Sequence, residues 1–191
     1  MKESKSLIWP LVLLIVVGAV YRSIPGRPWG FAPQYAMALF GGAVIRDKRW
    51  AFALPLLSML ISDVLYEFLF YFGLTPIQGF YQDQWINYLL FAGLTLFSFT
   101  LKRITVLSVT IYSIIVPTLY YLGVDFLYWL RGGKDLTTQL PLTKDFHGLM
   151  QAYAQGWPFY RGYVMGTLFF SAVLFGGYYL LTKRTVQKAH S

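Results

Sequence analysis

The chain has 191 residues, of which 57% are hydrophobic, 19% aromatic and only 13% charged, and its mean hydropathy is +0.52. In a typical soluble domain about a quarter of all residues are charged. The composition therefore excludes an ordinary soluble domain and predicts a polytopic membrane protein. The formal charge of +8 comes from short Lys and Arg clusters between apolar runs, which favours topology signals over a nucleic-acid surface, and the absence of cysteine excludes disulfides and thiolate sites.

Six apolar runs predict an all-α membrane protein, a six-transmembrane-helix bundle that forms one domain over residues 1–191. In chain order the runs cover residues 7–21, 32–45, 50–72, 85–101, 104–130 and 163–182. Because a helix needs roughly 20 residues to cross the hydrocarbon core, the first two runs are short for a span. Before the last run, the mixed apolar and polar pattern HGLMQAYAQGWPFY predicts a short interfacial helix.

The basic residues predict which end of the bundle is cytoplasmic. Counted in alternate gaps between the runs, ten Lys and Arg residues fall on one side and six on the other. Since cytoplasmic loops are enriched in these residues, the excess places both termini and the turns RDKR and KR in the cytoplasm. The outer connections RSIPGRPWGF, GLTPIQGFYQDQ and 131–162 are long, and function is concentrated in such loops.

Three carboxylates lie in the outer halves of the predicted spans. Asp63 and Glu67 are four residues apart in LISDVLYEFLF and therefore share one helix face, and Asp125 falls near the outer end of the fifth run. An ionised group that faces lipid is costly, so these side chains should face the bundle interior, a partner or water. Either they hold helices together through hydrogen bonds, or an acid or its arginine partner contacts a ligand; the sequence leaves both open.

Basic and aromatic residues on the same outer side complete a candidate ligand site. The candidate partners of the acids are Arg22, Arg27 and Arg161. The aromatic residues gathered there include Trp29, Tyr66 and Trp129. They suit the wall of a pocket for a flat or partly apolar ligand, and they equally suit the aromatic belt that membrane proteins carry at the interface.

Two further patterns concern packing and chemistry. Small residues recur four apart, as in Gly162 with Gly166, which lets helices approach closely, either inside the bundle or against a second membrane protein. No GxSxG, HExxH or P-loop occurs, and the only histidines are His147 and His190. We therefore expect no enzyme activity, no metal site and no cofactor.

Several segments resemble a known family when they are taken in order. Residues 31–68 read FAPQYAMALFGGAVIRDKRWAFALPLLSMLISDVLYEF. They resemble a bacterial membrane family of unknown function whose members carry FSPvaAlaLFgGa, a basic turn, and an apolar helix with Pro and then Ser-Asp. GVDFLYW is similar to that family's SNFxxW, and GLMQAYAQGWPFYRGYVMGTLFFSAVLFG to its GLxxcYxxaiPFfrntllGdllys. The likeness covers most of residues 24–177, with Asp125 where the family has Asn.

That family is similar in turn to the substrate-binding S components of energy-coupling factor (ECF) transporters. The resemblance implies a six-helix protein of the bacterial cytoplasmic (inner) membrane that binds a vitamin or metal ion near the outer face. It also implies docking onto a transmembrane coupling protein with two ATPases. Carried onto this chain, the resemblance implies that the pair Ser62 and Asp63, the aromatic residue Trp129 and the arginine Arg161 belong to the site.

The sequence therefore supports the hypothesis of a substrate-binding component for small-molecule uptake, surrounded by membrane lipid and energised by a separate ATP-driven module. The acids favour a cationic or polar ligand and the arginines an anion, so the charge of the ligand stays open. One alternative is a stand-alone proton-coupled transporter, since burial raises the pKa of an unpaired acid. The other is a structural or assembly subunit of a membrane complex. Nucleic acid is not an expected partner.

Overall fold

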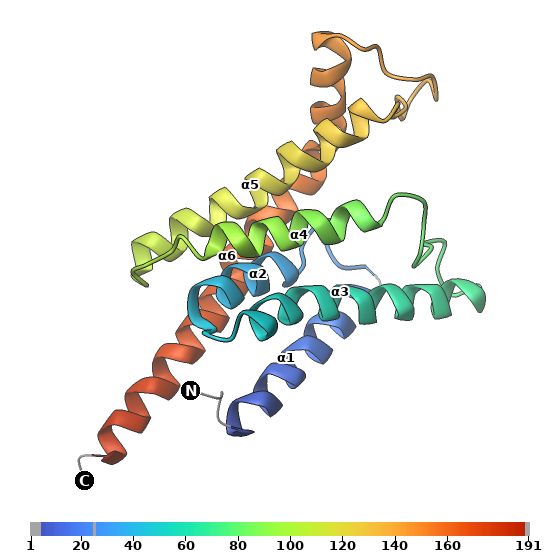
Figure 1. Cartoon of the computed structure of the whole chain (residues 1–191). Helices are drawn as coiled ribbons and strands as arrows, with labels where there is room; N and C mark the ends of the chain where they lie inside the picture. The colour runs from blue at the N-terminus through green and yellow to red at the C-terminus, as the bar shows by residue number, and fades with distance from the viewer. Residues whose placement is uncertain (1–4, 25, 190–191) are drawn as a thin grey trace.

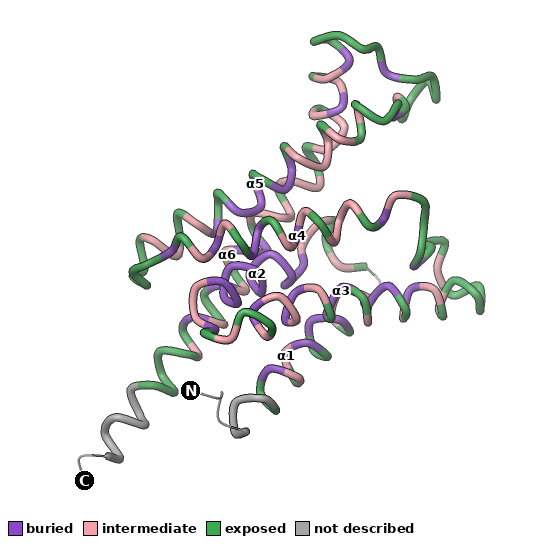
Figure 2. Tube along the Cα trace, in the orientation of Figure 1, coloured by how far each residue is buried: buried purple, intermediate pink, exposed green. Residues whose placement is uncertain are grey.

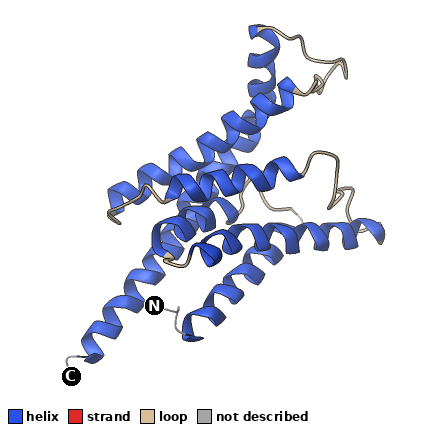
Figure 3. Ribbon diagram, in the orientation of Figure 1, coloured by secondary structure: helices blue, strands red, loops and turns tan. Residues whose placement is uncertain are grey.

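The computed structural model describes residues 5–24 and 26–189, and most of them are helical. The six helices are α1 (Lys5–Ser23), α2 (Gln34–Val44), α3 (Lys48–Tyr71), α4 (Trp85–Ser98), α5 (Val106–Leu130) and α6 (Phe146–Ala189) (Figure 1). Within the described residues the only extended pairing is an isolated bridge between Lys134 and Pro141. The predicted all-α fold is confirmed (Figure 3); Lys2 and His190 lie outside the described residues.

Three of the described helices are long and apolar enough to cross a membrane, namely α3, α5 and residues 146–182 of α6. At about 1.5 Å per residue, the 14 residues of α4 and the 11 of α2 extend roughly 21 and 16 Å, less than the ~30 Å hydrocarbon core. The described apolar part of α1 is the short segment Trp9–Ser23. The structure thus supports a membrane protein, but only three of the six predicted spans reach the required length.

The position of α2 explains why its sequence resembles a span. This helix packs against α3, α4, α5 and α6, and every residue from Gln34 to Gly42 is buried. Figure 2 shows the buried positions concentrated on α2 and on the faces of the helices around it. A helix that is apolar all round is surrounded either by lipid or by protein, and here protein covers it.

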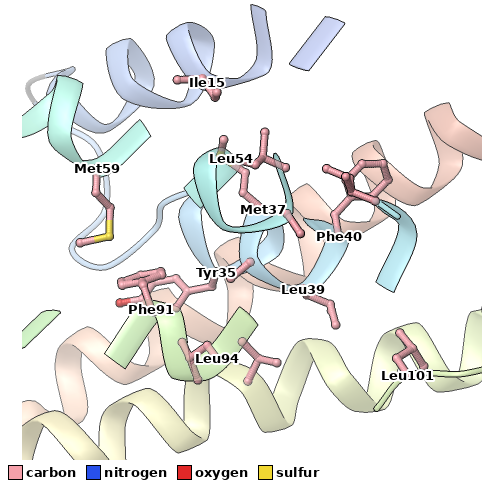
Figure 4. Close-up of a cluster of buried hydrophobic side chains, with 14 of the residues drawn as sticks. Ile15, Tyr35, Met37, Leu39, Phe40, Leu54, Met59, Phe91, Leu94 and Leu101 are labelled. Carbon is pink, nitrogen blue, oxygen red and sulfur yellow. The ribbon is translucent and has the colours of Figure 1, made fainter. Parts of the chain in front are cut away.

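The hydrophobic core gathers around this central helix (Figure 4). Met37 and Leu39 of α2 and Leu54 of α3 are 2% exposed or less. The ring of Tyr35 lies 4.9 Å from the ring of Phe91 on α4, centroid to centroid. The core therefore ties the short helices α2 and α4 to the long helix α3.

Glycines allow α2 and α6 to approach their neighbours closely. A side chain at Gly42 would lie 2.7 Å from the carbonyl oxygen of Thr95 on α4. A side chain at Gly162 would overlap the carbonyl oxygen of Trp29, whereas one at Gly176 would meet nothing within 4 Å. The predicted small-residue contacts at these two crowded positions are thus used for packing inside the bundle.

The predicted interfacial helix is not a separate element. Residues 146–189 form one continuous helix of 44 residues that contains Pro158, so the last helix begins at Phe146 and not near residue 163. The Trp-Pro dipeptide suggested a boundary because the residue before a proline disfavours helical geometry. Proline inside a helix can instead bend it, and Figure 1 shows the orange start of α6 at an angle to its red end.

The connections divide into two groups by position. Figures 1 and 3 show the long connections α1–α2, α3–α4 and α5–α6 at one end of the bundle. The short turns at residues 45–47 and 99–105, the start of α1 and the end of α6 lie toward the other end. The end with the long connections carries the candidate site.

Candidate functional site

Asp63 joins three elements through one buried carboxylate. It is 1% exposed and lies on the face of α3 that also buries Met59, Ser62 and Tyr66. Its Oδ1 accepts a hydrogen bond from Nη1 of Arg22, at the last turn of α1. Its Oδ2 accepts from Nε2 of Gln84, which precedes α4, and from the hydroxyl of Tyr88 on α4 at 2.5 Å. Both carboxylate oxygens are therefore occupied by protein donors, as a buried charge requires.

Arg22 faces this carboxylate on one side and a cavity on the other. Its Nη1 also donates to the Ser62 hydroxyl at 2.5 Å, and its side chain remains 24% exposed. No hydrogen bond joins its Nε or Nη2 to any described residue, and it lines the cavity. A cation at the carboxyl end of a helix is also favoured by the helix dipole.

Arg27 holds the α1–α2 connection over the end of α1. Its Nε donates to the carbonyl of Arg22 at 2.7 Å and its Nη1 to the carbonyl of Phe31 at 3.2 Å. Tyr66 of α3 donates its hydroxyl to the same Arg22 carbonyl at 2.7 Å, and Nη2 of Arg27 lies 3.4 Å from the Tyr66 oxygen. These contacts fix the Arg27 guanidinium and the Tyr66 hydroxyl on the backbone at the end of α1 that carries Arg22.

The cavity next to these arginines has a volume of about 1090 Å³. Its polar lining includes Arg22, Arg27, Gln34, Tyr66, Thr75, Tyr81 and Asn87. Its aromatic lining includes Trp29, Tyr35, Phe91, Tyr120, Phe159 and Tyr163. Binding sites for drug-sized ligands have roughly this size and are likewise mainly apolar with a few placed polar groups.

The walls of the cavity are held by contacts between side chains. Trp29 stacks on Phe159 of α6 with centroids 5.2 Å apart and planes 15° apart. Tyr120 of α5 donates to Asn87 Oδ1 at 2.9 Å, and Asn87 Nδ2 donates to the Tyr81 hydroxyl at 2.6 Å. Helices α4, α5 and α6 thus each contribute a positioned side chain.

Gln34 forms a polar, buried part of the cavity lining. Its Nε2 donates to the carbonyl of Gly18 at 3.1 Å and to the Ser58 hydroxyl at 3.0 Å. Its Oε1 is buried and has no hydrogen-bond partner among the described residues. Because buried polar atoms are nearly always paired, this oxygen distinguishes Gln34 from the other polar residues of the lining.

Glu67 shares the helix face of Asp63 as predicted, but it does not line the cavity. Its Oε2 accepts from the backbone N–H groups of Gly79 and Phe80, each at 3.0 Å. It therefore fixes the α3–α4 connection against α3 and pairs with none of the three candidate arginines.

The cavity lining does not include Asp125, Trp129 or Arg161. Asp125 is half-buried against Gly156 of α6. Trp129 donates its indole N–H to the carbonyl of Thr143 at 2.7 Å and thereby anchors the α5–α6 connection. Arg161 is exposed and lines neither described cavity. The predicted site residues thus separate into a cavity group of Arg22, Arg27, Trp29 and Tyr66, with Asp63 behind it, and four residues elsewhere.

A second cavity, of about 630 Å³, lies between the α3–α4 and α5–α6 connections. Asp83 and Arg131 line it and form an ion pair in which Arg131 Nε lies 3.1 Å from Asp83 Oδ2. The sequence reasoning missed this pair and also missed Gln34, Gln84 and Tyr88. For Gln34 a signal exists, because a polar residue inside an apolar run indicates a function or a buried hydrogen bond.

Comparison with known proteins identifies the family of this chain. No curated protein and no solved structure matches the chain, so the likeness to S components stays a prediction. Within the described residues, no group of three or more His, Cys, Asp or Glu side chains is placed to hold a metal ion. A family model described as "Family of unknown function (DUF6580)" matches residues 2–189. Since this match spans nearly the whole sequence, the chain belongs to DUF6580, a family of unknown function.

Proposed function

We propose that this protein is a membrane-embedded binding component for the uptake of a small molecule. The observation that carries the proposal is the 1090 Å³ cavity at the end of the bundle where the long connections lie. Two arginines and several aromatic side chains line it, and they come from all six helices and from the α1–α2 and α3–α4 connections. A cavity between helices with few, convergent polar groups is the usual form of a ligand site.

The proposed setting is the bacterial cytoplasmic membrane, with six passes, both termini in the cytoplasm and the cavity open to the outside. Large apolar side chains exposed along α3 and α5 support contact with lipid: Leu57, Leu60, Val64, Phe68, Leu107, Ile111, Ile114, Leu119 and Leu122. Positions rich in Lys and Arg lie on the short turns, at the end opposite the cavity, as expected for cytoplasmic loops. The connections at their ends would then complete the passes of the short helices α2 and α4. Neighbouring helices cover α2, whereas α4 exposes Leu89 and Leu96.

The proposed mode of action follows that of S components. The protein binds its ligand from outside, and a transmembrane coupling protein with ATPases rearranges it to release the ligand inward. One observation favours a second candidate, a stand-alone proton-coupled transporter: Asp125 is a half-buried carboxylate in α5 that forms no hydrogen bond to any described residue. Such a group changes its charge readily when its surroundings change.

Ligand-dependent stabilisation tests the proposal. Purified protein in detergent is heated with a library of vitamins, nucleobases, metal ions and amino-acid derivatives. A ligand that binds only the folded state raises its stability by RT ln(1 + [L]/Kd). We expect at least one compound to raise the melting temperature.

Two tryptophan variants show whether the ligand occupies the cavity. Trp29 lines it and is 70% exposed, while Trp85 is 55% exposed and lines neither cavity. The shift should persist in Trp85→Ala and decrease in Trp29→Ala. If no compound shifts the melting temperature, the proposal fails and a structural or assembly subunit becomes the better account.

A further inference from the structure

The carboxylates near the cavity are paired with protein donors and do not line its wall. Both oxygens of Asp63 accept hydrogen bonds from protein side chains, and Glu67 accepts from two backbone N–H groups. No acidic residue is among the described residues that line the cavity. A bound cation would therefore meet no free carboxylate on the cavity wall.

The guanidinium groups, by contrast, are presented to the cavity. An arginine has five N–H donors. Arg22 uses its Nη1 group for Ser62 and Asp63, and its Nε and Nη2 groups bond to no described residue. Arg27 uses one bond each from Nε, Nη1 and Nη2. Since Asp63 balances only one of the two positive charges, the wall has an uncompensated positive charge and unused donors.

Much of the rest of the wall is aromatic. Tyr35 lies within 5.1 Å of Phe91 and of Tyr120, centroid to centroid, and within 4.9 Å of Tyr163. The stacked pair of Trp29 and Phe159 adds a further surface. Aromatic surfaces of this kind favour offset or edge-on contacts with another ring.

We infer that the cavity takes a small organic anion, a carboxylate or phosphate attached to a planar ring, with the anion on Arg22 and Arg27 and the ring among the aromatic side chains. This inference rests on the proposed function, because it names the ligand class of the same cavity. Arginine suits the anion because its planar fork of donors matches a carboxylate or phosphate.

A charge series on one ring system tests the inference. The probes are indole-3-acetate, indole-3-acetamide and tryptamine, which carry a negative, a neutral and a positive side chain on the same indole. Melting temperature and equilibrium affinity are measured in detergent for each probe, with phosphatidylglycerol as a separate arm for an anion without a ring. We expect indole-3-acetate to bind most tightly and tryptamine not to bind.

Two variants assign the binding to the cavity. Arg27→Gln should lower the affinity for indole-3-acetate by about tenfold or more, since a charge-assisted hydrogen bond and a compensating charge are lost. Arg161→Gln removes an exposed arginine that lines neither cavity and should leave the affinity unchanged.

Each contrary result has a distinct meaning. If tryptamine binds more tightly than indole-3-acetate, or if only phosphatidylglycerol stabilises the protein, the inferred ligand class is wrong. The proposal that the protein binds a small molecule would still stand. Equal loss of affinity in Arg27→Gln and Arg161→Gln overturns the assignment to the cavity arginines. Binding of no probe, together with no shift from the compound library, overturns both this inference and the proposed function.

Discussion

Replacing Asp63 by Asn tests the account of the buried carboxylate. The substitution keeps the shape of the side chain but removes its charge and turns one acceptor oxygen into an N–H₂ donor. The three groups that now donate to this carboxylate, on Arg22, Gln84 and Tyr88, would face one acceptor in place of two. Removing one partner of a buried ion pair costs roughly 3–5 kcal/mol.

The structure places the expected loss at the lower end of that range. The Asp63 side chain is 2% exposed, but the Arg22 side chain keeps 24% exposure and its bond to Ser62, so Arg22 is not left wholly uncompensated. We expect Asp63→Asn to lower the free energy of unfolding by about 3 kcal/mol. For a chain of this length that corresponds to a drop of roughly 6–12 °C in melting temperature.

The matched control is Asp83→Asn at the exposed ion pair with Arg131. There the side chains are 33% and 44% exposed, and exposed pairs contribute roughly 0–1 kcal/mol. Both variants are unfolded reversibly in detergent and compared with wild type. A loss below about 1 kcal/mol for Asp63→Asn, or equal losses in the two variants, would refute the claim that the buried carboxylate holds α1, α3 and α4 together.

Three other predictions concern packing, hydrogen bonding and pH. Gly42→Ala should destabilise the protein by about 1–3 kcal/mol because its side chain meets Thr95, whereas Gly176→Ala has open space and should be neutral or stabilising in thermal unfolding. Tyr88→Phe should lower the free energy of unfolding by about 1.5–3 kcal/mol, the usual contribution of a hydrogen bond to a charged group; an unchanged midpoint would argue against that bond. The backbone N–H of Thr137 lowers the pKa of Asp135 from its ordinary value of 3.8. The stability that this bond gives to the α5–α6 connection should be present above pH ~4 and lost as the pH falls through the lower folded-state pKa; hydrogen exchange of that connection should show this loss, and Asp135→Asn should abolish the pH dependence.

The helices were largely predictable from hydrophobic runs, and their surroundings were not. The runs at 50–72 and 104–130 agree with α3 and α5 to within two residues at each end. The run at 32–45 also matches α2 in position, but composition does not tell whether lipid or protein surrounds a helix. Only the packing of four other helices around α2 decides that question.

The helix face of the two acids could be predicted from the sequence, but their hydrogen-bond partners could be predicted only in part. Helical spacing places Asp63 and Glu67 on one face, and Arg22 was among the three arginines expected to pair with them. Gln84 and Tyr88 were not foreseen, because their contact with Asp63 depends on how the α3–α4 connection folds back. The same fold-back brings Gly79 to Glu67, and no sequence pattern marks that contact.

The cavity itself depends on contacts between residues far apart in sequence. Arg27 reaches Tyr66, and Trp29 stacks on Phe159. Residue types alone suited an interfacial aromatic belt as well as a pocket wall. Trp129 illustrates the difference, because it anchors a connection and lines neither cavity.

Thiol labelling in intact bacterial cells tests most directly the central claim, a cavity that opens to the outside. The chain contains no cysteine, so single-cysteine variants report on one position each. Thr75 lines the cavity, and Lys102 lies in the short turn between α4 and α5. With a membrane-impermeant maleimide, the account predicts labelling of Thr75→Cys in intact cells and of Lys102→Cys only after lysis. Labelling of Lys102→Cys in intact cells, with Thr75→Cys protected until lysis, would contradict the account.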